Sequence, residues 1–278
     1  MTVVAAFNWL DEIIIVADSR VSWNGKRPPE DVLIKLHIFN DARKAIVIGF
    51  AGDLQVIKTV MVQLNFKFEK YSHRFVLSIL KDKVRRWIEE VTLGKLRPGI
   101  KRDIKFILCG MERSCHPEVK QDGLTIGHMP WPQMHFYEYT INCVSGKVQL
   151  ISSPGPIVIG SGAALKAEII EAFQRSIKFG FNLSALRPAR ALIVTDTISL
   201  IFKDSPQSPE VGGPFHYICL TPDRLQQNYV WPSDGNFKNF AITKSGTKTI
   251  LYNSELNKTF TLNPVWEVSF LKNGNLEV

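Results

Sequence analysis

The sequence predicts an α+β fold, a four-layer αββα sandwich with two antiparallel sheets between helix pairs and a small C-terminal β appendage. Runs of strand-like residues alternate twice with pairs of helix-like segments. Near-continuous apolar runs such as 13–18 and 44–50 are typical of strands covered on both faces. Beyond Asp234, Asn, Lys, Thr and Gly punctuate short β segments. We therefore expect one domain over residues 1–233 and a β-rich extension over 234–278.

The first half of the chain contains two predicted hairpins followed by two helices. Strands are predicted where β-branched and apolar residues run between polar turn signals. In chain order these strands are 2–7, 13–18, 33–39, 44–50 and 104–110. Helices are predicted where apolar residues recur every three to four positions. These helices are 53–66 and 71–91.

The second half repeats this order. The segment 111–133 carries Pro, Gly and His and is expected to be a loop. The predicted strands are 134–142, 147–152, 157–160 and 215–220, and the predicted helices are 163–179 and 182–200. The extension contains short β segments at 240–243, 249–252, 259–262 and 266–271.

Composition narrows the classes of function. The chain has 278 residues and a net charge of +8, but its positive residues are scattered, which argues against nucleic-acid binding. The densest basic cluster, 81–86, has helical spacing and is interpreted as a solvated helix face. The four cysteines show no Cys-x-x-Cys spacing, and no metal or cofactor is expected. Neither a signal peptide nor a membrane span is indicated, so we expect a cytoplasmic protein.

Thr2 directly follows Met1, and small residues at this position favour removal of the methionine. Removal leaves Thr2 with an α-amine beside its own hydroxyl. Such an amine titrates at about pH 7.7–8.0 and can act as a general base for that hydroxyl. Thr2 is therefore a candidate nucleophile, and its activation would need only the loss of Met1.

Several short motifs lie in register along the chain and resemble the proteasome β-subunit family, specifically the bacterial proteasome-like branch of the N-terminal nucleophile hydrolases. The resemblance covers about 2–65 and 155–220. Its motifs are Thr2-Val3-Val4-Ala5-Ala6, Val16-Ala17-Asp18-Ser19-Arg20, Lys35, Gly49-Phe50-Ala51-Gly52-Asp53, Gly160-Ser161-Gly162 and Val211-Gly212-Gly213-Pro214. It implies two antiparallel sheets flanked by helix pairs, with Thr2 at the head of the first strand.

The resemblance also implies a role for each site residue. Thr2 is the nucleophile, Lys35 lowers the effective pKa of its hydroxyl, and Asp18 pairs with Lys35. Arg20 is a supporting ion-pair residue near the same site. Gly52 begins a predicted helix, so its N–H is the candidate oxyanion-hole donor.

Ser161 matches the serine that hydrogen-bonds the terminal amine. At one further place the sequence departs from the family, which carries an Asp-x-x-Ser pair just before the Gly-Gly. The corresponding residues are Ser208 and Val211, and Asp204 with Ser205 lies slightly upstream as a possible substitute.

The resemblance further implies a substrate-binding region. Its positions are Val21, Ser22, Leu33, His37, Phe50 and Leu54. These residues are mostly apolar, which favours an apolar side chain before the scissile bond. An extended substrate is expected to pair with the backbone at Val21-Ser22 and Gly52 as an added β-strand.

Two functions from different classes remain open. The first is a threonine-dependent peptidase or amidase that acts on a polypeptide or peptide and forms a homo-oligomeric ring, with any unfoldase partner unspecified. The second is a catalytically inactive structural or binding subunit. The presence of Thr2, Asp18 and Lys35 favours the enzyme, while Val211 in place of a serine favours the inactive subunit.

Overall fold

The computed structural model describes most of the chain. The described residues are 2–9, 12–21, 30–40, 44–96, 104–112, 120–121, 124–125, 133–153, 155–180, 194–195, 197–198, 201, 211–221, 225–231, 238–239, 241–254, 257–267, 269–270 and 276–277.

A six-stranded sheet contains the N-terminal strand at an inner position. Its order is β13-β1-β2-β14-β15-β16, and every neighbouring pair is antiparallel. The strands are β13 (Ile157–Gly160), β1 (Val3–Trp9), β2 (Glu12–Asp18), β14 (Phe215–Leu220), β15 (Leu225–Trp231) and β16 (Lys238–Asn239). Residues of β1, β2 and β14 are buried almost throughout, as the apolar runs predict.

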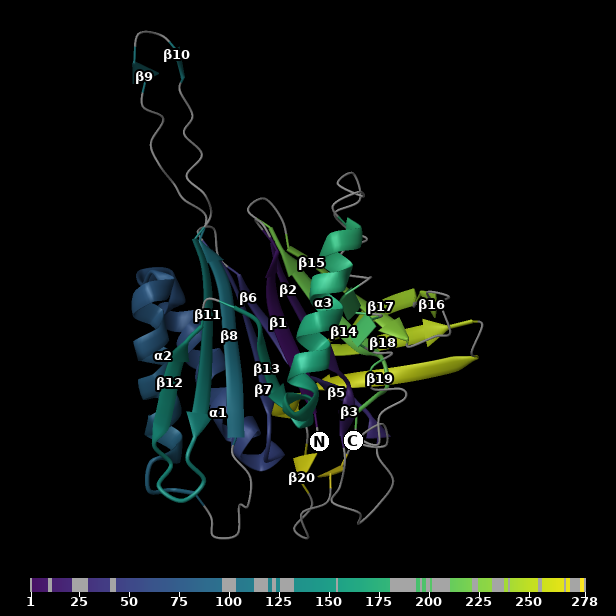
Figure 1. Ribbon diagram of the computed structural model, residues 1–278. Coiled ribbons are helices and arrows are strands. Elements are labelled where there is room, and N and C mark those ends of the chain that lie inside the picture. The colour runs from purple at the N-terminus through teal and green to yellow at the C-terminus, as the bar shows by residue number, and fades with distance from the viewer. Residues whose placement is uncertain are drawn as a thin grey trace.

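A five-stranded antiparallel sheet packs face to face on the first (Figure 1). Its order is β12-β11-β8-β7-β6, and its strands are β12 (Val148–Ser152), β11 (Gln133–Ile141), β8 (Ile104–Glu112), β7 (Lys44–Ala51) and β6 (Leu36–Asn40). The interface is an apolar core in which Val4 and Ile15 of one sheet share a cluster with Val47 and Ile107 of the other.

Two long helices cover the outer face of the five-stranded sheet. They are α1 (Leu54–Tyr71) and α2 (Leu77–Thr92), joined by the short 3₁₀ turn η1 (Ser72–Arg74). Asp53 caps α1, because its carboxylate accepts from the backbone N–H of Gln55 at 3.0 Å and of Val56 at 3.2 Å. The other sheet is covered by η2 (Ser161–Leu165) and α3 (Lys166–Gly180), whose Phe173 stacks on Phe7 at 4.3 Å.

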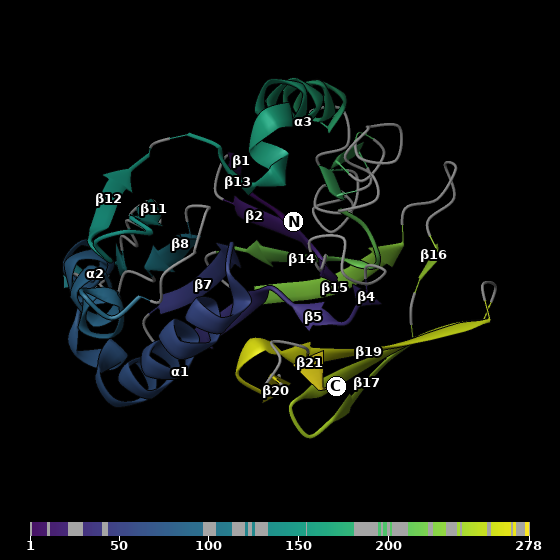
Figure 2. The same cartoon turned by 90° about the horizontal axis from the view of Figure 1, so that it is seen from below.

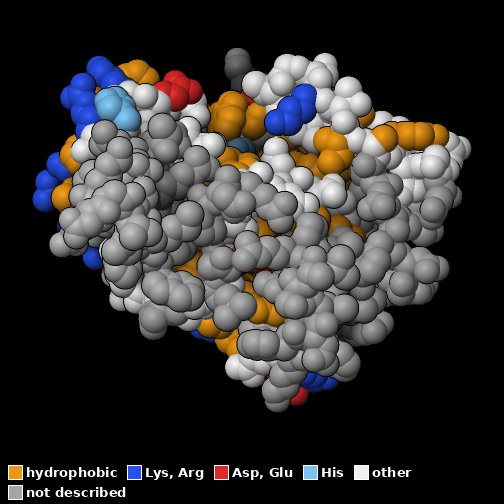
Figure 3. All heavy atoms as spheres, turned by 90° about the horizontal axis from the view of Figure 1, so that it is seen from above, with side chains coloured by type: hydrophobic (Ala, Val, Ile, Leu, Met, Phe, Trp, Pro, Cys, Tyr) orange, Lys and Arg blue, Asp and Glu red, His pale blue; other side chains and the backbone are white. Residues whose placement is uncertain are grey.

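The basic cluster 81–86 lies on α2, as predicted. Val84 is buried against the sheet, whereas Arg86 on the opposite side is exposed. Figure 3 shows that most Lys and Arg side chains visible from above gather on the side of the molecule where α1 and α2 lie. The cluster is therefore a solvated helix face.

A third sheet is built mainly from the C-terminal region. Its order is β17-β18-β19-β5, with β17 (Ala241–Ser245), β18 (Lys248–Asn253), β19 (Lys258–Pro264) and β5 (Leu33–Ile34). Figure 2 shows β19 alongside β5. The two strands pair in parallel, with Asn263 opposite Leu33, and Asn263 N–H donates to the Val32 carbonyl at 2.9 Å. The C-terminal strands thus attach directly to the strand that precedes Lys35.

Smaller elements complete the described chain. They are β3 (Arg20–Val21) paired with β4 (Glu30–Asp31), β9 (Lys120–Gln121) paired with β10 (Leu124–Thr125), β20 (Ser269–Phe270) paired with β21 (Leu276–Glu277), and the 3₁₀ turn η4 (Val265–Glu267). Among the described residues, no helix combines the length and the apolar character needed to cross a membrane.

The predicted four-layer sandwich with helix pairs on both sides is wrong. Strands dominate the described residues. Three α-helices have defined bounds, two on one sheet and one on the other, and beyond these only residues 194–195, 197–198 and 201 of the described chain are α-helical. A third sheet of four strands was not predicted as such. Apolar periodicity identifies single elements, but it carries no information on how many helices pack on each sheet. Most of the predicted helix 182–200 lies outside the described residues.

Candidate active site

The centre of the site is a buried pair of opposite charges. Asp18 ends β2 and Lys35 lies between β5 and β6, and both are only 1% exposed. The Lys35 Nζ atom donates to Asp18 Oδ1 at 2.8 Å. A lysine within the apolar run 33–39 needs a carboxylate when it is removed from water, and Asp18 supplies that carboxylate.

Asp18 also holds the backbone beside Thr2. Its Oδ1 atom accepts from the Val3 N–H at 2.9 Å, and its Oδ2 atom accepts from the Gly212 N–H at 3.4 Å. A single carboxylate therefore links Lys35, the first strand and the segment that precedes β14. The backbone following Thr2 is thereby fixed relative to Lys35.

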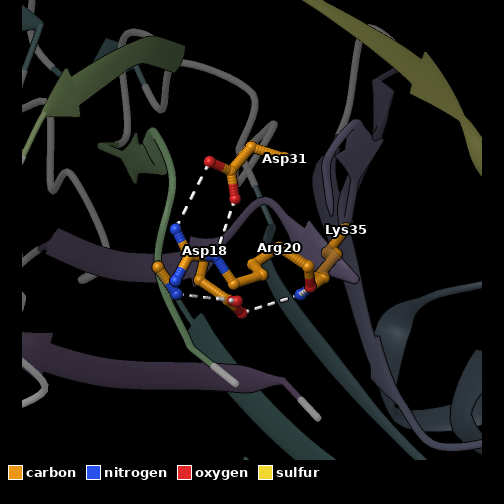
Figure 4. Close-up of polar contacts among 5 residues, drawn as sticks. Asp18, Arg20, Asp31 and Lys35 are labelled. Carbon is orange, nitrogen blue, oxygen red and sulfur yellow. Dashed lines mark hydrogen bonds and ion pairs between the residues drawn. The ribbon is translucent and has the colours of Figure 1, made fainter. Parts of the chain in front are cut away.

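Arg20 extends this network toward β4. The Lys35 ammonium donates to the Arg20 carbonyl, while the Arg20 guanidinium pairs with Asp31 through Nε–Oδ1 at 2.8 Å and Nη2–Oδ2 at 3.4 Å. Figure 4 shows the two ion pairs side by side. A Cβ at Gly212 would lie 2.8 Å from Arg20 Cζ, so a side chain at this position would displace the Arg20 guanidinium.

Burial shifts the pKa values of both central groups. Desolvation raises the pKa of the Asp18 carboxyl, and the nearby Lys35 opposes this effect. Desolvation likewise lowers the pKa of the Lys35 ammonium, and Asp18 opposes it. A lysine whose pKa is lowered releases its proton more readily than an exposed one.

Thr2 meets the end of β13 and the end of β7. Gly160 pairs with Val3 and has φ +82°, and a Cβ at Gly160 would lie 2.0 Å from the Thr2 carbonyl oxygen and 3.2 Å from Ala51 Cβ. Gly52 follows Ala51 directly, is exposed, and precedes the α1 cap Asp53. The backbones of Thr2, Gly160 and the turn before α1 therefore converge.

The predicted substrate-binding residues also come together. Val21, Leu33 and Phe50 belong to one buried cluster, and Leu54 packs against it. His37 is 5% exposed and stacks on Phe50 with ring centroids 5.7 Å apart. Desolvation lowers the pKa of His37 to about 3, so its ring is neutral near pH 7.

Some predicted residues lie outside the described part of the structure. These are Met1, Ser22, Asp204, Ser205 and Ser208. Ser161 begins η2, but its side chain is outside the described part. Val211 is described and is 3% exposed. Within the described residues, no group of three His, Cys, Asp or Glu side chains is arranged to hold a metal ion.

Sequence reasoning missed two residues of this network. Asp31, which pairs with Arg20, was not predicted, and Gly212 was named only as part of a motif, without the contact of its N–H with Asp18. The short antiparallel pair formed by β3 and β4 brings Arg20 opposite Asp31. The contact of Gly212 spans 194 residues and has no local signal.

Comparisons with solved structures identify similar folds. Anbu (ancestral beta-subunit) from Yersinia bercovieri has a TM-score of 0.52 and 13% identity, over 84% of this chain and 88% of that chain. An Anbu (Gly-1) mutant from Hyphomicrobium sp. strain MC1 has a TM-score of 0.53 and 14% identity, over 85% of this chain and 89% of that chain. At these identities the likeness shows the fold alone. Neither a protein-family model nor a curated protein matches the chain.

These comparisons correct the resemblance drawn from the motifs. The assignment to the proteasome β-subunit family, in its bacterial proteasome-like branch, is wrong, because no family model matches and the solved structures compared above are Anbu proteins. The motifs are short and mark places where a strand end meets a turn or a helix. Such places are properties of a fold, which different families share.

Proposed function

We propose that this chain is an amide hydrolase whose nucleophile is Thr2 once Thr2 carries a free α-amine. The observation that carries the proposal is the buried Asp18–Lys35 pair, whose carboxylate holds the N–H of Val3 at 2.9 Å. This contact positions the residue adjoining Thr2 beside a buried ammonium. A buried charge pair has a high desolvation cost, and it is typical of sites where a proton is handled.

The chemistry follows from the groups that converge on Thr2. The Thr2 hydroxyl attacks the substrate carbonyl while the α-amine accepts the hydroxyl proton. The Gly52 N–H is suited to stabilise the negative oxygen that develops, because it is exposed just before the α1 cap. The proton then passes to the leaving amine as the C–N bond breaks, and water hydrolyses the resulting ester to regenerate Thr2.

Lys35 and Asp18 position and polarise this reaction. The Lys35 charge favours the alkoxide form of Thr2 and disfavours protonation of the adjacent amine. Asp18 keeps Lys35 in place, and the ion pair with Asp31 holds Arg20, whose carbonyl accepts from Lys35. The proposed substrate is a polypeptide or peptide. Because Anbu, whose fold is similar, is an ancestral beta-subunit, we extend the proposal to a homo-oligomer.

Covalent labelling tests the proposal. The wild-type protein is incubated with a small electrophile that bridges an α-amine and a β-hydroxyl, and its intact mass is measured. We expect loss of Met1 and addition of one reagent, retention of labelling in Thr2→Ser, and its loss in Thr2→Ala. Retained Met1, or equal labelling of Thr2→Ala, would contradict the proposal.

The backbone contact between Gly160 and Thr2 gives a second expected result. In Gly160→Ala the new Cβ collides with the Thr2 carbonyl at a positive φ, so Thr2 must shift. Because displacement of a reacting group by about 1 Å can cost about 10² in rate, we expect labelling to slow by that order. The rate is measured by intact mass over time.

Gly146→Ala is the matched control. Gly146 has φ +72°, and a Cβ there would lie 2.0 Å from the Thr92 carbonyl, at the C-terminal end of α2. Both variants should lose about 1–3 kcal/mol of stability through backbone strain. Only Gly160→Ala should label slowly; equal labelling rates in the two variants would show that Gly160 does not position Thr2.

A specific observation favours the second candidate, a catalytically inactive structural or binding subunit. Val211 lies where a serine was expected, is buried, and has no hydroxyl to support the terminal amine. The labelling experiment separates the two functions, because an inactive subunit has no reactive Thr2.

A further inference from the structure

The segment that follows β19 lies on the apolar cluster beside the Asp18–Lys35 pair. Parallel pairing places Asn263 opposite Leu33 and Pro264 opposite Ile34, so the chain leaves β19 directly at the strand that leads to Lys35. The turn η4 begins at the next residue, Val265. The C-terminal region is thereby brought to the site from more than 200 residues away in the sequence.

Val265 belongs to this cluster, and Trp266 packs against it. Val265 is 0% exposed and belongs to the same buried cluster as Val21, Leu33 and Phe50. The half-buried Trp266 ring lies 4.4 Å from the His37 ring and is tilted by 43°. His37 is thus in contact with Phe50 on β7 and with Trp266 from the C-terminal region.

The cluster adjoins the proposed catalytic groups on several sides. Val21 follows Arg20, whose carbonyl accepts from Lys35. Leu33 and His37 are each two residues from Lys35 in the sequence, and Phe50 and Leu54 flank the turn that contains Gly52. A substrate side chain next to a carbonyl at Thr2 would enter this cluster. However, Val21, Leu33, His37 and Phe50 are each at most 5% exposed.

We propose that Val265 and Trp266 occupy the position of a substrate side chain, so the chain's own C-terminal segment caps its substrate pocket. The capped pocket accepts substrates with glycine or another very small residue before the scissile bond. Moving or shortening Trp266 opens it to large apolar side chains. This inference rests on the proposed function, and it replaces the expectation of an apolar preference in the native chain.

Two electrophiles with the same reactive group test the cap. One carries no side chain and the other carries a benzyl side chain, and the rates at which each labels Thr2 are measured by intact mass. In the wild-type protein, the reagent without a side chain should react much faster. In Trp266→Ala, the ratio of the benzyl rate to the unsubstituted rate should rise by at least about tenfold, because fit in an apolar pocket discriminates at that scale.

Controls separate the cap from general effects on folding. Tyr252→Ala removes a 43% exposed aromatic side chain from β18 of the same sheet and should leave the ratio unchanged. Trp266→Leu keeps an apolar side chain and should raise the ratio less than Trp266→Ala. If Trp266→Ala does not fold, the rate ratio in Trp266→Leu tests the cap instead.

Each outcome has a defined meaning. Equal reaction of both reagents with the wild-type protein overturns the cap and leaves the proposed function intact. An unchanged ratio in both Trp266 variants has the same meaning. If neither reagent labels Thr2 in any of these proteins, the proposed function fails, and this inference fails with it.

Discussion

Lys35→Met is expected to destabilise the protein by about 3–5 kcal/mol and to abolish labelling of Thr2, because it leaves the Asp18 carboxylate buried without its cation. Asp18 is 1% exposed, so water cannot replace the lost partner. The carboxyl is then expected to take up a proton, which weakens its hold on the Val3 N–H. Urea denaturation measures the first effect, and intact mass after electrophile treatment measures the second.

Two further variants test whether the unpaired Asp18 charge causes the loss of stability in Lys35→Met. The double variant Asp18→Asn/Lys35→Met removes both charges and should regain much of the lost stability while remaining unlabelled. Arg175→Met breaks an i,i+4 pair with Glu171 whose side chains are 67% and 63% exposed, and it should cost less than about 1 kcal/mol. If Lys35→Met costs no more than Arg175→Met, the Asp18–Lys35 pair does not stabilise the fold.

Acidification is expected to reduce the stability of the fold steeply between pH 6.5 and about 3. Desolvation lowers the pKa of both His37 and His216 to about 3, whereas an unfolded histidine titrates at about 6.5. Below pH 6.5 the unfolded chain therefore binds protons that the folded chain does not. Stability is unaffected by these groups above that pH and falls as the pH decreases through the window.

The expected loss of stability on acidification is large compared with the total stability of a domain. Each histidine contributes roughly 1 kcal/mol of lost stability per pH unit within the window, so two contribute on the order of 5 kcal/mol between pH 7 and pH 4. That is comparable to the total stability of many domains, which is about 5–15 kcal/mol. The free energy of unfolding is measured in urea at pH 7, 6, 5 and 4.

His216→Phe isolates one of the two contributions. The His216 ring stacks on Tyr229 with centroids 4.4 Å apart, and a phenyl ring keeps that stacking without titrating. Its stability should fall less steeply with acidification than that of the wild-type protein. His73→Phe, on the exposed turn η1, is the control and should retain the wild-type slope. Identical slopes in all three proteins would show that buried neutral His216 is not a source of the pH dependence.

Local signals predicted the elements around the site, as the first two strands illustrate. The runs 2–7 and 13–18 were predicted as a hairpin, and they form β1 and β2. Lys35 within an apolar strand indicated a need for water or a carboxylate, and the resemblance implied Asp18 as its partner, which is the residue that pairs with Lys35 in the structure. These predictions succeed because strand alternation and the cost of burying a charge are both expressed by neighbouring residues.

Long-range packing accounts for what was missed. The distribution of helices over the sheets, and the pairing of β19 with β5, depend on contacts between segments that no local pattern connects. The family assignment was wrong for a related reason, because short motifs identify turns of a fold rather than a family. The cap formed by Val265 and Trp266 belongs to the same class of missed features.

The sequence by itself determined the candidate chemistry: a threonine that acquires a free amine when Met1 is lost, and a lysine and an aspartate in apolar strands where charges require partners. The tertiary structure alone decided that Asp18 holds Val3, that Gly212 and Asp31 complete the network, and that the C-terminal segment lies on the predicted substrate pocket. The difference is physical. Residue type and spacing set which groups need partners, whereas the packing of sheets and segments distant in sequence selects which partners they meet.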